Sequence, residues 1–124
     1  MERSYFLTLC LLVLHQIDAA YWHEWEMFYL PGGVQGYLAF NIIAIPIVIL
    51  GYKHIVLRSN KAVFFARICA ALGLLTFLIH GGFALAGFEQ FHLPLSMAII
   101  LGCLVASVWQ FVEIRKFGLS HTAA

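Results

Sequence analysis

Side chains that can do chemistry are concentrated in one stretch of the chain, HQIDAAYWHEWEMFYLPGG, at residues 15–33. His15 and Asp18 are three positions apart, so on a helix they lie on the same face. An imidazole beside a carboxylate can bind a transition-metal ion, exchange protons or hydrogen-bond to a neighbouring helix. This pair is the starting point for a functional interpretation.

Three aromatic residues continue the same face at spacings of three or four positions, namely Trp22, Trp25 and Tyr29. Tryptophan and tyrosine collect where a membrane helix meets water, so we expect these three residues to be interfacial anchors. Glu26 lies beside this stripe. Helical spacing places Glu24 away from the stripe, at the level of solvent or lipid head groups.

Two polar residues on later segments fall at the same depth as this pair. If the basic residues mark one membrane boundary, His15 and Asp18 lie roughly 18 and 22 Å from it, at about 1.5 Å per helical residue. Asn41 lies about 18 Å and His80 about 20 Å from the same boundary on their own helices. The sequence therefore predicts a buried His/Asp/Asn layer, open toward the face opposite the basic residues.

A divalent metal ion is the first ligand that this layer could bind. His15, Asp18 and His80 have the donor types of zinc and non-haem iron sites, and Asn41 could hydrogen-bond to the ligands. Glu26 and His92 are candidate contributors at the outer surface, while Ser and Cys nucleophiles are missing at this depth. The absence of a nucleophile argues against an enzyme.

Three alternatives stay open from the residues alone. A haem could be ligated by His15 and His80 from opposing helices, which we rank below a divalent metal. An ion-coupled carrier could use Asp18 and His80 to relay protons, and would need a homo-oligomer or larger membrane complex to enclose a path. The polar cluster could also act only as a structural element that fixes helix packing in an accessory subunit.

The elements that position these residues are four apolar segments, each long enough to cross a bilayer. They span residues 3–30, 34–57, 62–87 and 93–117 and form one domain over 1–124. Pro31, Gly32 and Gly33 end the first segment. With 63% hydrophobic and 10% charged residues and a mean hydropathy of +0.92, the composition is that of an integral membrane protein. We predict an all-α bundle of four transmembrane helices embedded in the lipid bilayer.

The distribution of charge predicts how the chain is oriented in the membrane and excludes nucleic acid as a partner. The net charge of +1 and the lack of a basic, aromatic-rich run give no nucleic-acid footprint. The seven Lys and Arg residues all fall at one side of the predicted bundle. By the positive-inside rule, both termini are expected in the cytoplasm and residues 15–33 on the other side.

The segment LHQIDAAYWHEWEMFYLPGGVQGYLAFN, residues 14–41, resembles a signature of small uncharacterised bacterial membrane proteins classed as a domain of unknown function. The resemblance implies a four-helix protein of the bacterial inner (plasma) membrane, and it implies no known activity. His15, Asp18, Glu24 and Trp25 are its signature positions here, so Glu24 joins the candidate contributors through the resemblance. His15 and Asp18 are also more loosely similar to the His-x-x-Glu-Glu membrane family, whose second acid is replaced by Ala19.

Overall fold

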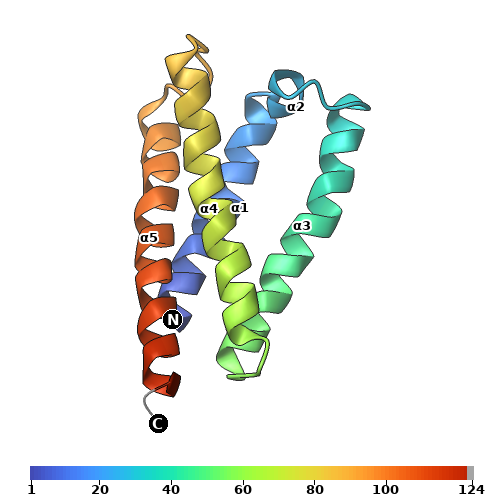
Figure 1. Ribbon diagram of the computed structural model, residues 1–124. Coiled ribbons are helices and arrows are strands. Elements are labelled where there is room, and N and C mark those ends of the chain that lie inside the picture. The colour runs from blue at the N-terminus through green and yellow to red at the C-terminus, as the bar shows by residue number, and fades with distance from the viewer. Residues whose placement is uncertain (123–124) are drawn as a thin grey trace.

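The chain forms a bundle of long helices (Figure 1). A computed structural model describes residues 1–122, with side chains described for residues 1–117. This part of the chain is all-helical and contains no strand. Its helices are α1 (Glu2–Tyr21), α2 (Glu24–Met27), α3 (Gly33–Val56), α4 (Ala62–Leu85) and α5 (Pro94–Thr122).

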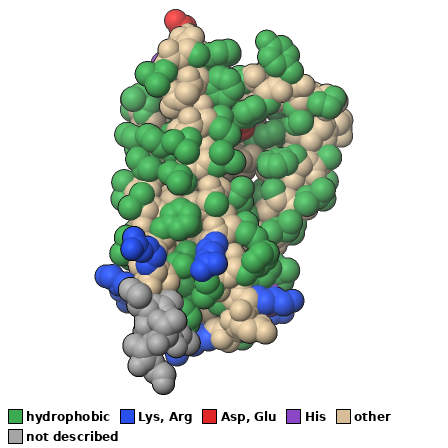
Figure 2. Space-filling model, in the orientation of Figure 1, with side chains coloured by type: hydrophobic (Ala, Val, Ile, Leu, Met, Phe, Trp, Pro, Cys, Tyr) green, Lys and Arg blue, Asp and Glu red, His purple; other side chains and the backbone are tan. Residues whose placement is uncertain are grey.

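Four of these helices, α1, α3, α4 and α5, are long and apolar enough to cross a membrane, which confirms the predicted fold class. The second and third begin and end within two residues of the expected positions. The helix α3 runs through Pro46, as membrane helices tolerate. Large apolar side chains cover the outside of the bundle, and Lys and Arg lie at its lower end in Figure 2.

The first expected helix, residues 3–30, is divided in two. The helix α1 ends at Tyr21, and His23 adopts a left-handed backbone conformation with φ of 53°. The chain then turns into the short helix α2 before Pro31 and Gly32 lead into α3. Non-glycine residues enter this conformation at a cost of about 1–2 kcal/mol, although histidine does so more often than most. No glycine or proline marks the break, so helical spacing alone could not predict it.

The helices α1, α4 and α5 pack closely at the centre of the bundle. Gly73 of α4 is buried so tightly that an added Cβ would overlap the Ser107 hydroxyl and approach Thr8 of α1. The Gln110 side chain donates a hydrogen bond to the carbonyl of Ala66 at 2.8 Å. Small residues such as Gly73 allow this close approach of membrane helices.

The helix α3 is the most loosely packed of the four spans. Only 17% of the residues in its apolar 18-residue stretch are buried in the bundle, against 39% for α1 and 33% for α4 and α5. It contacts α1, α2 and α4, and within the described part of the chain it makes no contact with α5. Figure 1 shows α3 leaning away from α4 toward the end that carries α2. This end, opposite the Lys and Arg residues, is called the distal end below.

Candidate metal centre

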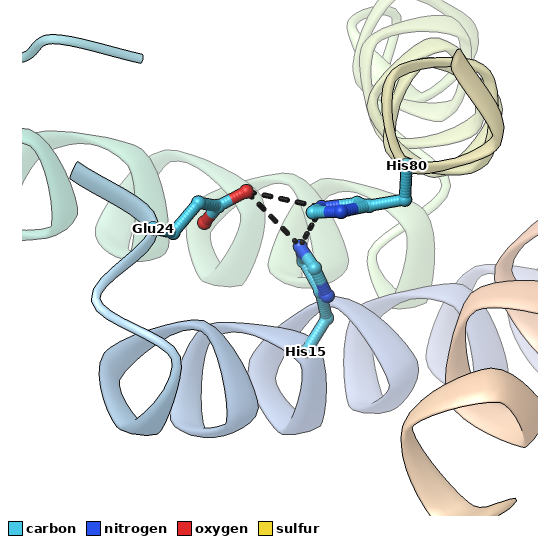
Figure 3. A group of neighbouring side chains, drawn as sticks. All are labelled: His15, Glu24 and His80. Atoms are coloured by element: carbon cyan, nitrogen blue, oxygen red, sulfur yellow. Dashed lines mark hydrogen bonds and ion pairs between the residues drawn. The ribbon is translucent and has the colours of Figure 1, made fainter. Parts of the chain in front are cut away.

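Three side chains from three helices converge near the distal end of the bundle (Figure 3). The Nε2 atom of His80 lies 3.1 Å from Nε2 of His15 and 3.0 Å from Oε1 of Glu24. The third side of this triangle, from His15 Nε2 to Glu24 Oε1, measures 3.7 Å. All three residues are buried. We call this group the His15–Glu24–His80 cluster.

The two histidines are held by the packing of α1 and α4 around an aromatic residue. Phe91, in the segment between α4 and α5, is 4% exposed and packs against both imidazole rings at tilted angles. Its ring centroid lies 5.6 Å from that of His15 and 4.3 Å from that of His80. The two imidazoles meet edge to face at 4.6 Å. Their Nε2 atoms therefore point toward the same place.

Glu24 reaches the cluster because the chain breaks after α1. The left-handed turn at His23 places α2 over the end of α1, and Glu24 at the start of α2 points back toward the bundle (Figure 3). Glu24 is 7% exposed, so the expectation that it lies at solvent or head-group level is wrong. Its burial follows from the helix break, which invalidates spacing counted along one continuous helix.

The size of the triangle matches a metal-binding face. Sides of 3.0, 3.1 and 3.7 Å place the three atoms on a circle with a radius of about 1.9 Å. An ion about 2.0–2.1 Å from each atom would then lie roughly 0.7 Å above their plane, as in a tetrahedral site. The same three atoms also suit one face of a two-histidine, one-carboxylate iron site. The arrangement leaves further coordination positions open.

The two histidines keep the Glu24 carboxyl group ionised. Burial by itself raises the pKa of Glu24, but hydrogen bonds and charge interactions with His15 and His80 outweigh it and lower the pKa to about 2. The carboxyl group is therefore ionised near neutral pH. One proton on His80 Nε2 cannot point at both His15 and Glu24, whereas a cation between the three atoms attracts all of them.

The structure brings together some of the predicted residues and separates others. His15 and His80, predicted at one depth, are in contact. Asp18 is outside the cluster, half-buried, and its Oδ2 atom has no hydrogen-bond partner among the described residues. Asn41 lines the same cavity as the cluster, and its amide donates a hydrogen bond to the carbonyl of Tyr37 at 3.0 Å.

The remaining candidates lie at the distal surface. Glu26 and His92 are exposed and take no part in the cluster. Trp22 is half-buried against Phe91, and Tyr29 is 92% exposed. Trp25 is half-buried too and lines the cavity.

A cavity of about 410 Å³ extends from the cluster between α1, α3 and α4. Its distal part is lined by His15, Glu24 and His80 together with Asn41 and Tyr37. Its deeper part is lined by aliphatic side chains, including Leu9, Leu12, Ala44, Val48 and Leu72. Cavities of this size, mostly apolar with a few convergent polar groups, are typical of ligand-binding sites.

Helical spacing missed Glu24 as a member of the cluster. The signal that identified it was the Tyr-Trp-x-Glu-Trp part of the resemblance, which marks a position without explaining it. The structure supplies the reason, since only the residue after the turn at His23 faces back toward the histidines.

Fold and site together define a four-helix membrane protein with a buried cluster of two histidines and one glutamate. The chain belongs to a family described as "Family of unknown function (DUF6713)", which it matches over residues 1–117. No curated protein and no solved structure matches it.

Proposed function

We propose that this protein binds one divalent transition-metal ion in the membrane through His15, Glu24 and His80. The observation that carries the proposal is the convergence of two Nε2 atoms and one carboxylate oxygen within 3.0–3.7 Å, from three separate helices. If both Nε2–H groups donated to Glu24, they would face each other at 3.1 Å, whereas a cation between the three atoms attracts all of them. Zn²⁺ and Fe²⁺ are the ions that such nitrogen and oxygen donors suit.

The carboxylate in this proposal is Glu24 in place of the predicted Asp18. Asp18 follows His15 by three positions, so the two side chains are offset by about 60° around α1. Glu24 approaches from another helix and completes the triangle. Asn41 remains a candidate to hydrogen-bond a water or ligand on the ion, because its Oδ1 atom is buried and lacks a partner in the described structure.

The geometry argues against a haem held by this histidine pair. Two axial ligands lie on opposite faces of a porphyrin, with the macrocycle between them. The two Nε2 atoms are only 3.1 Å apart, which leaves no gap for the ring.

Metal analysis of the purified protein tests the proposal. The protein would be extracted in mild detergent, stripped with a chelator and titrated with Zn²⁺ and with Co²⁺, whose visible spectrum reports its coordination. We expect about one ion per chain, held by nitrogen and oxygen ligands. His15→Ala and His80→Ala should lose this binding, and the matched control His92→Ala should keep it.

The outcomes separate a metal site from a purely structural cluster. If the wild type binds no Zn²⁺ or Co²⁺ while His15→Ala and His80→Ala lower the unfolding temperature, the cluster only fixes helix packing. If the wild type binds metal and the two variants bind it equally well, the ligands are other residues. Either result overturns the proposal.

The basic residues at one end of the bundle support a proposed orientation. The positive-inside rule supports placing both termini in the cytoplasm and the cluster toward the non-cytoplasmic face. The resemblance to bacterial proteins supports the inner membrane as the location. A reporter that is active only in the cytoplasm, fused to the C-terminus, should be active. An inactive fusion would reverse the orientation.

A further inference from the structure

The cavity that adjoins the His15–Glu24–His80 cluster has two chemically different ends. Polar side chains gather at the distal end, and aliphatic side chains line the rest. Along α1, the distance from His15 to Leu9 is about 9 Å, and along α4, the distance from His80 to Leu72 is about 12 Å. With carbon–carbon bonds of about 1.5 Å, an extended zigzag chain advances about 1.3 Å per carbon, so roughly seven to nine methylene groups fit this length.

The cavity also opens sideways, toward the position of the lipid. Phe40 of α3 and Leu75 of α4 both line it, yet they are 53% and 50% exposed. Both lie within membrane-spanning helices, on the side where α3 leans away from α4. Figure 2 shows a hollow on this face of the bundle, and Glu24 is the one acidic residue in the cavity lining. A molecule in the bilayer can therefore enter without crossing water.

Charge indicates the head group of that molecule. A divalent cation beside the Glu24 carboxylate carries a net charge of about +1, and the cavity lining holds no second acidic residue and no Lys or Arg. An uncompensated charge in an apolar site is costly, so an anionic oxygen ligand on an open coordination position is favoured. Asn41 Oδ1, a buried acceptor at the same end, suits a metal-bound water, which can donate to it, rather than the carboxylate head itself.

We infer that the cavity binds a single-chain amphiphile whose carboxylate-like head coordinates the metal and whose alkyl chain lies between α1, α3 and α4. The ligand enters from the bilayer between α3 and α4. This inference rests on the proposed metal site and adds the class of molecule that the site recognises. A small anion would leave the aliphatic end of the cavity empty, and a hydrocarbon would leave the polar end unmatched. An amphiphile matches both ends.

Binding of two hydroxamates to the Co²⁺-loaded protein in detergent tests the inference. Acetohydroxamate and decanohydroxamate share the same chelating head and differ only in chain length. We expect decanohydroxamate to change the Co²⁺ spectrum at a concentration at least about 100-fold lower, because each buried methylene group strengthens binding several-fold. Equal potency of the two compounds would overturn the inference and leave the metal site intact.

Two alanine substitutions in α3 locate the chain. Ala44 is half-buried and lines the cavity, whereas Ala39 is exposed and does not. Ala44→Phe should remove the advantage of decanohydroxamate while leaving Co²⁺ binding unchanged, which also shows that the variant folds. Ala39→Phe should behave like the wild type. If decanohydroxamate stayed more potent than acetohydroxamate by the same factor in Ala44→Phe, the inference would be overturned. It would also be overturned if the wild type formed oligomers in detergent and Ala44→Phe did not, because the groove would then bind a second copy of the chain.

A third measurement does not depend on the metal. 2-Bromodecanoate, brominated next to its carboxylate, quenches tryptophan fluorescence by contact, and Trp25 lines the distal end of the cavity while Trp109 is 41% exposed on α5. A variant that keeps only Trp25 should be quenched more strongly than one that keeps only Trp109. Equal quenching would place the chain in the surrounding detergent. Absence of Co²⁺ binding would overturn the metal site and the head-group assignment, independently of this quenching result.

Discussion

Glu24 and Glu26 lie in the same four-residue helix, and replacing each by glutamine separates a metal ligand from a surface acid. Glu24 is 7% exposed and its Oε1 lies 3.0 Å from His80 Nε2, whereas Glu26 is exposed and its Oε1 lies 3.8 Å from His23 Nδ1. Both substitutions remove one negative charge and preserve size. We expect Glu24→Gln to weaken Zn²⁺ binding strongly and Glu26→Gln to leave it within about twofold of the wild type.

The size of the loss follows from the number of ligands. Zinc held by four protein ligands is bound by about 10–16 kcal/mol, which is roughly 2.5–4 kcal/mol for each ligand. At about 1.4 kcal/mol for each factor of ten, the loss of one ligand lowers affinity about 100- to 1000-fold. The amide oxygen of glutamine remains a weak, neutral donor, so the lower part of this range is expected for Glu24→Gln.

Competition against a chromophoric chelator measures these affinities in detergent. Circular dichroism on the same samples checks that both variants keep their helix content. Wild-type affinity in Glu24→Gln would refute the assignment of Glu24 as a ligand, and with it the functional importance of the turn at His23. An equal loss in Glu26→Gln would show that only the overall charge of this segment matters.

Four further measurements test the surroundings of the site. Asp18→Asn should weaken Zn²⁺ binding by at most about tenfold in chelator competition, because Asp18 lies outside the cluster; a loss as large as that of Glu24→Gln would contradict this. His23→Gly should keep Zn²⁺ binding, whereas His23→Val should weaken it, since a β-branched residue resists a φ of 53°; equal affinities would show that this turn does not position Glu24. Gly51→Ala should lower the free energy of unfolding by about 1–3 kcal/mol in thermal melts, because the new Cβ would overlap the Tyr5 hydroxyl, and an unchanged melting temperature would argue against this close packing. The lowered pKa of Glu24 stabilises the metal-free protein above pH 4.5, and this stabilisation is lost as the pH falls toward about 2. The difference in free energy of unfolding between the metal-free wild type and Glu24→Gln should therefore narrow between these two pH values. A constant difference would contradict the lowered pKa.

The four membrane helices could be predicted from the sequence because their apolar runs are long and their ends carry clear signals. The pairing of His15 with His80 could also be predicted, since the two residues lie at nearly the same depth along their helices, which is visible in the sequence. Glu24 could not be derived from spacing. Its place depends on a left-handed turn at His23, for which the sequence offers neither a glycine nor a proline.

Asp18 illustrates the opposite error. It shares a helical face with His15, and this proximity made it the expected carboxylate ligand. Neighbours on one helix diverge around the axis, however, while a residue from a separate element can point directly at the histidine. A site built from several elements therefore depends on the turns between them as well as on the periodicity within them.

The cavity between α3 and α4 could not be predicted from hydropathy. Apart from Tyr37 and Asn41, the residues of α3 that line the cavity are as apolar as its outward-facing ones, so hydropathy does not distinguish lipid from an internal space. Only the lean of α3 separates the two.

The short helix α2 has a consequence for the speed of metal exchange. It covers the end of α1 and supplies Glu24, so the covering segment is itself one of the proposed ligands. Lifting of α2 would break the bond between Glu24 and a bound ion, so motion of this helix and loss of one ligand are coupled. We therefore expect slow dissociation whose rate responds to the stability of α2, so that this four-residue helix sets the residence time of the ion.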